Sequence, residues 1–130
     1  MVIDVLIQKQ TREVLERETL PVKEQHKPLD LEQSLGIAAF VGKSLSDENR
    51  LRILSSLCKG KKTVSTIVEE MNLSQPLVSH HLKELRRCLL VKVERKGLFV
   101  YYEIADERII NIMRQLAHLA TDLLSQRDTF

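Results

Sequence analysis

A set of polar side chains around positions 74–83 has the chemistry needed to contact a nucleic acid. The set, which includes the apolar Pro76 beside its polar members, recurs at spacings that place it on one side of a helix. Its residues are Ser74, Gln75, Pro76, Ser79, His80 and Lys83. A glutamine amide can read adenine, a serine hydroxyl can bond to several base edges, and a lysine ammonium can bind guanine or phosphate. The first turn of such a helix also presents N–H groups that can donate to phosphate. A solvated helix face is the alternative interpretation of these residues.

The residues just before this set predict a helix-turn-helix. Thr63 can cap a short helix, and Asn72 can adopt the left-handed conformation that ends it. Ser74 can then cap the next helix, with Pro76 in the first turn, where a missing N–H has no consequence. This second helix spans residues 75–88 and carries an apolar stripe of Val78, Leu82, Leu85 and Leu89. Two helices joined by about three residues are typical of a helix-turn-helix.

After residue 90 the apolar period changes from 3.6 to 2, which predicts a β-hairpin. Apolar and polar residues alternate over 91–94 and again over 98–104, and Arg95-Lys96-Gly97 supplies a basic turn between them. Such a tip can contact the nucleic-acid backbone or minor groove, and these contacts position a protein without specifying sequence. Further phosphate contacts are expected near the start of the helix before the turn, from Lys62, Thr63 and Ser65.

Helices are also predicted on both sides of this central region. Residues 31–45 carry apolar residues at three- and four-residue spacing after a capping Asp30, and Ser46 is expected to cap the helix that follows. A long helix over residues 106–126 carries two adjoining apolar stripes. One stripe can pack on the domain, and the second would be exposed in a monomer, which indicates a partner.

Length and composition limit the remaining classes of protein. The 130 residues are enough for one domain, here 29–127, after an N-terminal extension, 1–28, of uncertain structure. Residues 46–103 hold eleven Lys and Arg against seven Asp and Glu, so positive charge is concentrated in the centre of the chain. No apolar run is long enough to cross a bilayer, and no signal peptide is visible, so we expect a cytoplasmic protein. No motif indicates an enzyme or a cofactor.

Taken together, these segments resemble one known family. Three segments, in this order, are similar to the ArsR/SmtB repressors. They are Ser-Asp-Glu-Asn-Arg-Leu-Arg-Ile-Leu from residue 46, Leu-Ser-Gln-Pro-Leu-Val-Ser-His-His-Leu-Lys-Glu-Leu from residue 73, and Lys-Gly-Leu-Phe-Val-Tyr-Tyr-Glu-Ile up to residue 104. The resemblance implies a mainly α fold with a small β-hairpin, a winged helix-turn-helix with long N- and C-terminal dimerisation helices. It also implies a homodimer that represses from a pseudo-palindromic DNA operator until a signal relieves it. The residues then assigned to dimerisation are Leu31, Leu35, Ala38, Ile109, Ile112, Met113, Leu116, Leu119 and Leu123.

The signal is not evident from the sequence. Some family members bind metal through thiolates at the position occupied here by Thr63-Val64-Ser65. Others use a pattern of carboxylates and histidines on the last helix, which Asp106, His118 and Asp122 do not reproduce. No metal site is therefore predicted. Cys58 and Cys88 leave a thiol-based redox switch open, although buried, inert cysteines are the more ordinary interpretation. A metal- or thiol-responsive repressor, an unidentified small-molecule signal, and a winged helix that binds protein without DNA therefore remain alternatives.

Two residues near the second helix have structural interpretations. His81 lies towards the packed side, where a hydrogen-bonded structural histidine is expected. Leu89 occupies a turn in which the family has small residues and glycine. A left-handed conformation there would be strained for leucine.

Overall fold

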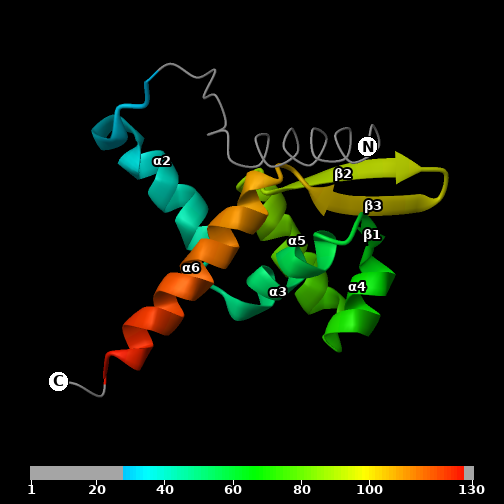
Figure 1. Cartoon of the computed structure of the whole chain (residues 1–130). Coiled ribbons are helices and arrows are strands. Elements are labelled where there is room, and N and C mark those ends of the chain that lie inside the picture. Colours follow the sequence, from blue (N-terminus) through cyan, green and yellow to red (C-terminus); the bar gives the residue numbers. More distant parts are fainter. Residues whose placement is uncertain (1–27, 128–130) are drawn as a thin grey trace, which may run out of the picture. The chain divides into compact units, whose positions relative to one another are not determined.

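The computed structural model describes residues 28–127, so the predicted extension, residues 1–28, lies outside the described residues except for its last position. The chain divides into two compact units at Ser34, and helix α2 begins in the first unit and continues into the second. The elements are α2 (Leu31–Ser44), α3 (Glu48–Leu57), β1 (Lys62–Thr63), α4 (Val64–Met71), α5 (Gln75–Arg87), β2 (Val91–Lys96), β3 (Phe99–Ile104) and α6 (Arg108–Ser125) (Figure 1). None of the described helices combines the length and apolarity needed to cross a lipid bilayer.

The junction between α2 and α3 differs from prediction by one residue. Asp47 caps α3, because its carboxylate accepts a hydrogen bond of 3.1 Å from the Arg50 N–H. This bond, which favours the ionised carboxylate, is the main cause of a lowered pKa at Asp47. Ser46, the predicted cap, instead donates its hydroxyl to the Lys43 carbonyl at 2.7 Å and so completes the end of α2. The prediction was wrong because two adjacent residues could each serve as a cap.

The helix-turn-helix between α4 and α5 is confirmed. Thr63 accepts a hydrogen bond from the Thr66 N–H and caps α4, which ends at Asn72 in the left-handed conformation with φ 52° and ψ 41°. Ser74 accepts a hydrogen bond from the Leu77 N–H, and Pro76 lies in the first turn of α5. The turn is thus fixed by three local backbone preferences that the residue types themselves supply.

The β-sheet contains a third strand in addition to the predicted hairpin. Its order is β1-β3-β2, and both pairs are antiparallel. β1 has two residues, of which Lys62 pairs with Tyr102. A strand this short was not predicted because two residues cannot show an alternation of apolar and polar side chains. In the hairpin Lys96 pairs with Phe99, so the turn is Gly97-Leu98. The predicted turn, Arg95-Lys96-Gly97, was wrong because Gly97, at φ 62°, takes the first of two central positions, where positive φ favours glycine.

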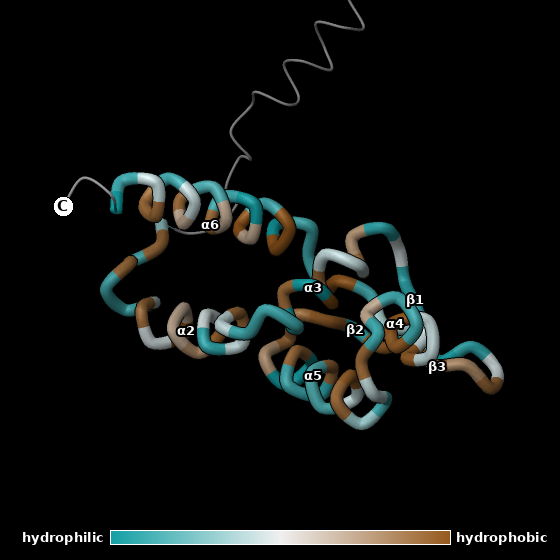
Figure 2. Tube along the Cα trace, turned by 90° about the horizontal axis from the view of Figure 1, so that it is seen from below, coloured by the Kyte–Doolittle hydropathy of each residue, from teal (hydrophilic) through white to brown (hydrophobic). Residues whose placement is uncertain are grey.

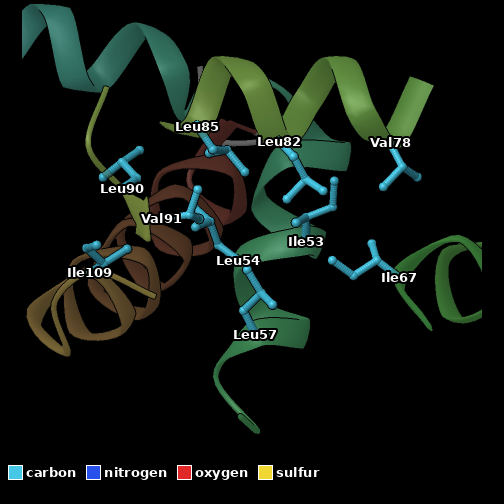
Figure 3. Packing of buried hydrophobic residues seen from close by; sticks show 10 residues of the cluster. All are labelled: Ile53, Leu54, Leu57, Ile67, Val78, Leu82, Leu85, Leu90, Val91 and Ile109. Atoms are coloured by element: carbon cyan, nitrogen blue, oxygen red, sulfur yellow. The ribbon is translucent and has the colours of Figure 1, made fainter. Parts of the chain in front are cut away.

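The core is aliphatic, as the scarcity of aromatic residues predicts. Helices α3, α4 and α5 supply most of its buried side chains, and the first residues of β2 and α6 complete it (Figure 3). The members of this cluster are Ile53, Leu54, Leu57, Ile67, Val78, Leu82, Leu85, Leu90, Val91 and Ile109. This core holds one side of α5 against the domain and leaves the other side in solvent.

The end of α5 is a Schellman motif with leucine where glycine is usual. The Leu90 N–H donates to the Leu85 carbonyl and the Leu89 N–H donates to the Arg86 carbonyl, each at 3.0 Å. Leu89 has φ 60°, and it is 80% exposed. It therefore does not extend the apolar stripe of the helix, as predicted, but adopts the strained conformation considered from the sequence.

Only the beginning of α6 packs on the domain. Ile109 is buried and Met113 is partly buried against the core, but the apolar residues farther along the helix are exposed. The packing of one apolar stripe on the domain, expected from the sequence, is therefore limited to the first turns of the helix. Apolar residues recur along both α2 and α6 (Figure 2).

Candidate nucleic-acid interface

The polar face predicted from the sequence is present on α5. Gln75, Pro76, Ser79, His80 and Lys83 are all exposed. Residues at the intervening helical positions, Val78, His81, Leu82 and Leu85, are buried. Within residues 28–127 the side chains of Gln75, Ser79 and Lys83 form no hydrogen bond or ion pair. Their donors and acceptors are consequently available to an external ligand.

Ser74 has a defined structural role at the start of this helix. Its hydroxyl accepts the Leu77 N–H at 3.4 Å, which confirms the predicted cap. Leu77 is 37% exposed although it was not among the residues predicted for this face. Its place in the first turn of α5, next to Gln75 and Pro76, is the signal that could have identified it.

The hairpin of β2 and β3 carries both charged and apolar groups at its end. Arg95, Lys96 and Gly97 are exposed, and Leu98 is 98% exposed at the turn itself. Glu94 reduces the local positive charge, because its carboxylate lies 2.8 Å from the Lys61 ammonium and 3.5 Å from that of Lys96. The pairing with Lys61 lowers the pKa of Glu94. The tip is therefore basic at Arg95 but less cationic than its sequence implies.

The predicted contacts before α4 divide into two groups. The Lys62 ammonium lies 2.7 Å from the Glu70 carboxylate and 2.8 Å from the Ser56 hydroxyl, and only 12% of the lysine side chain is exposed. Lys62 therefore holds α4 to α3, and this geometry disfavours a phosphate contact. Thr63 is partly buried in its capping role, whereas Ser65 is exposed. The pairing of Lys62 with Glu70 joins β1 to α4, and the spacing of residues within either element does not reveal it.

His81 is buried but is not hydrogen-bonded. The residue is 5% exposed, and neither ring nitrogen has a partner among the described residues. The Asp47 carboxylate lies 3.9 Å from Nε2. Burial lowers the pKa of His81 more than Asp47 raises it, so the neutral imidazole is favoured. The predicted burial is confirmed, and the predicted hydrogen bonding is wrong.

The two cysteines are both free, and their surroundings differ. Cys58 is exposed, contrary to the interpretation as a buried residue, and its thiol donates to the Leu54 carbonyl at 3.2 Å. Partial desolvation raises the pKa of Cys58, which disfavours the reactive thiolate. Cys88 is partly buried, with its sulfur 3.8 Å from the Phe40 carbonyl oxygen.

Among residues 28–127 no group of three or more histidine, cysteine, aspartate or glutamate side chains is placed to hold a metal ion. Asp106, one of the acidic residues considered from the sequence, forms an ion pair of 2.8 Å with Arg108. The same guanidinium, with the Arg108 backbone N–H, lowers the pKa of Asp106 to about 2.

Helices α2 and α6 each carry exposed apolar side chains. On α2 the exposed fractions are 67% for Leu31, 49% for Leu35 and 50% for Phe40. On α6 the large exposed side chains recur at helical spacing, and they are Ile112, Leu116, Leu119, Leu123 and Leu124. Large apolar side chains that recur on one side of an exposed helix are typical of a protein–protein interface.

These features define a winged helix-turn-helix protein, with α5 as the exposed second helix and the β2–β3 hairpin as the wing. Residues 47–93 match the family described as "Bacterial regulatory protein, arsR family". The chain is 37% identical over 93 residues to a transcriptional repressor SmtB homolog of Synechocystis sp., an alignment that covers 72% of this chain and 70% of the relative. It is also 41% identical over 64 residues to the transcriptional repressor SdpR of Bacillus subtilis, covering 49% and 71%.

Solved structures agree with this assignment. The homodimeric winged helix-turn-helix DNA-binding domain Mb0332 of Mycobacterium bovis has a TM-score of 0.63 and 28% identity, over 75% of this chain and 92% of that one. NolR from Sinorhizobium fredii has a TM-score of 0.62 and 30% identity, over 72% and 96%. The chain belongs to the ArsR family of transcriptional regulators, as the sequence resemblance predicted.

Proposed function

We propose that the chain is a homodimeric repressor that places α5 of each protomer in the major groove of a pseudo-palindromic operator. The observation that carries this proposal is the exposed face of α5, on which the side chains of Gln75, Ser79 and Lys83 form no hydrogen bond or ion pair within residues 28–127. The core on the opposite side of the helix fixes its orientation, so the face is presented by a rigid support. The repressor names of the SmtB homolog and SdpR support the direction of regulation.

Each residue of the face has a role in this proposal. Gln75 and Ser79 contact base edges, and Lys83 contacts guanine or phosphate. Ser74 and Pro76 lie at the N-terminal end of α5, where backbone N–H groups approach phosphate. His80 extends the same contact surface.

The wing completes the contact surface next to α5. Arg95, Lys96 and Gly97 contact the backbone or the minor groove, and Thr63 and Ser65 are phosphate contacts at the start of α4. Lys62 is left out of this contact set because it is engaged by Glu70.

The second protomer is proposed to cover the apolar surface of α2 and α6. The members of that interface are those assigned from the sequence except Ile109, which is buried in the core of its own domain and so was wrongly assigned to dimerisation. Phe40 and Leu124 are added because each is at least half exposed. The homodimeric state of the Mycobacterium bovis domain supports the same arrangement. Two copies related by a two-fold axis would read half-sites about one helical turn apart, about 10–10.5 base pairs.

We further propose that the protein acts in the cytoplasm, where it meets operator DNA, and that it has no catalytic role. A thiol switch at Cys58 and Cys88 remains an alternative for the signal. The raised pKa of Cys58 disfavours its thiolate, so Cys58 is the less reactive of the two cysteines proposed for such a switch.

Selection of binding sites from random duplex oligonucleotides tests the proposal. The full chain is expected to enrich a two-fold symmetric motif, whereas the Lys83→Ala variant enriches the same motif with lower affinity. A winged helix that serves only as a protein-interaction module would enrich no motif, and that result would refute the proposal.

A further inference from the structure

A cavity of about 340 Å³ lies among the end of α2, the start of α3 and the end of α5. Its size falls within the range of sites that bind small organic ligands. None of the residues assigned to DNA contact lines it, and those assigned to the dimer contribute only Phe40. The cavity is therefore a feature of the fold that the proposed repressor activity does not use.

The lining carries an excess of positive charge. Lys43, Arg50 and Arg87 supply three cations, and Glu84 supplies one carboxylate. Within residues 28–127 neither the Lys43 ammonium nor the Arg87 guanidinium forms an ion pair or a hydrogen bond. Both charges are consequently available to an anion that enters the cavity.

Arg50 is held in place at the wall of the cavity. Its Nε donates to the Ser44 carbonyl oxygen at 2.6 Å, and one terminal nitrogen lies 3.4 Å from the Lys43 carbonyl oxygen. A guanidinium has five N–H donors, so further donors remain after these two bonds. A fixed planar cation of this kind suits a carboxylate or a phosphate.

Two other lining residues indicate what the rest of the ligand requires. Ser44 is only 5% exposed, and its hydroxyl has no hydrogen-bond partner among the described residues. A buried hydroxyl without a partner is unfavourable, so this corner of the fold is under-satisfied as it stands. Phe40 is half exposed and offers an apolar wall beside the charged groups.

We propose that this cavity binds a small organic anion, with its carboxylate or phosphate held by Lys43, Arg50 and Arg87 and its apolar part against Phe40. The cavity touches both α2 and the C-terminal end of α5, so occupancy changes the free energy of placing one helix against the other. Binding of the anion therefore alters operator affinity, and this second statement rests on the proposed function.

Benzoate is a suitable probe because it joins a carboxylate to one aromatic ring, and benzyl alcohol is its neutral control. Titration of the ¹⁵N-labelled full chain with benzoate is expected to shift amide resonances of residues 40–44 and 84–88 saturably. A fragment of this size should have a dissociation constant of about 1–10 mM. Absence of saturation, or an equal response to benzyl alcohol, would overturn the proposal.

Adjacent arginines provide a matched pair of variants. Arg87→Gln is expected to weaken benzoate binding about fivefold or more. Arg86→Gln, which removes an exposed charge that does not line the cavity, should leave the affinity unchanged. If both variants lost benzoate affinity equally, the binding would depend on general surface charge, and the assignment of Arg87 to the site would be overturned.

Operator binding measured with benzoate, against sodium chloride at the same ionic strength, tests the coupling. We expect a change of about fivefold or more in affinity, the range of typical allosteric coupling. An unchanged affinity in a chain that binds benzoate would refute the coupling. If the chain binds no operator at all, the proposed function fails, and the resonance shifts still decide whether the anion site exists.

Discussion

Replacement of Leu89 by glycine or by alanine tests how α5 is connected to the wing. Leu89 is held at φ 60° by the Schellman hydrogen bonds that end α5, and it is 80% exposed. Either replacement removes the same small amount of burial, about 0.3–0.6 kcal/mol for a side chain that is four-fifths in solvent. Only glycine also removes the left-handed strain of an L-residue, which costs about 1–2 kcal/mol.

Glycine increases the entropy of the unfolded chain, which offsets about 0.5–1 kcal/mol of this relief. The Leu89→Gly variant should therefore be more stable than Leu89→Ala by about 0.7 kcal/mol, within a range of about 0–1.5 kcal/mol, which is a difference of a few degrees in Tm for a domain of this length. Urea unfolding followed by circular dichroism at one protein concentration measures the difference, with equal m-values required for the comparison. An alanine variant that is more stable than the glycine variant would show that the strain assigned to Leu89 is absent.

Four further predictions follow from the same structure. Lys83→Ala should weaken operator binding by about 1–3 kcal/mol in an electrophoretic titration, and unchanged affinity would remove Lys83 from the contact face. Arg95→Ala should reduce the slope of log K against log salt by about 1, and an unaltered slope would exclude a phosphate contact. Burial lowers the pKa of His81, so the unfolded state binds a proton more readily than the folded state, and the free energy of unfolding should fall as the pH drops below about 6.5. In the His81→Leu variant this contribution to the pH dependence should be missing. Equal pH dependence of stability in both proteins would contradict the assignment. Leu119→Glu should yield monomers in sedimentation, whereas Leu98→Glu, on the wing, should not, and a dimeric Leu119→Glu protein would exclude this part of α6 from the interface.

Features that depend on a residue's own backbone preferences were predictable from the sequence. Asn72, Ser74 and Pro76 each act locally, so the turn between α4 and α5 is visible without knowledge of the fold. The alternation of the hairpin and the two faces of α5 were also predictable, because periodicity reports burial directly. The family resemblance depended on these same segments.

Features that depend on how separate elements pack against one another were not predictable. The engagement of Lys62 by Glu70 depends on how α4 packs against α3, and β1 is visible only once β3 lies beside it. The position of the hairpin turn depends on the register of β2 against β3, which places Gly97 at positive φ in the turn. The exposure of α6 beyond Met113 depended on how far the domain extends, which its apolar pattern cannot report.

The central claim is that the exposed face of α5 enters the major groove at two half-sites, and methylation interference on the selected operator tests it most directly. Methylation of guanine N7, which lies in the major groove, should block binding at two positions related by two-fold symmetry and separated by about one helical turn. Interference confined to adenine N3 in the minor groove, or to a single half-site, would contradict the account.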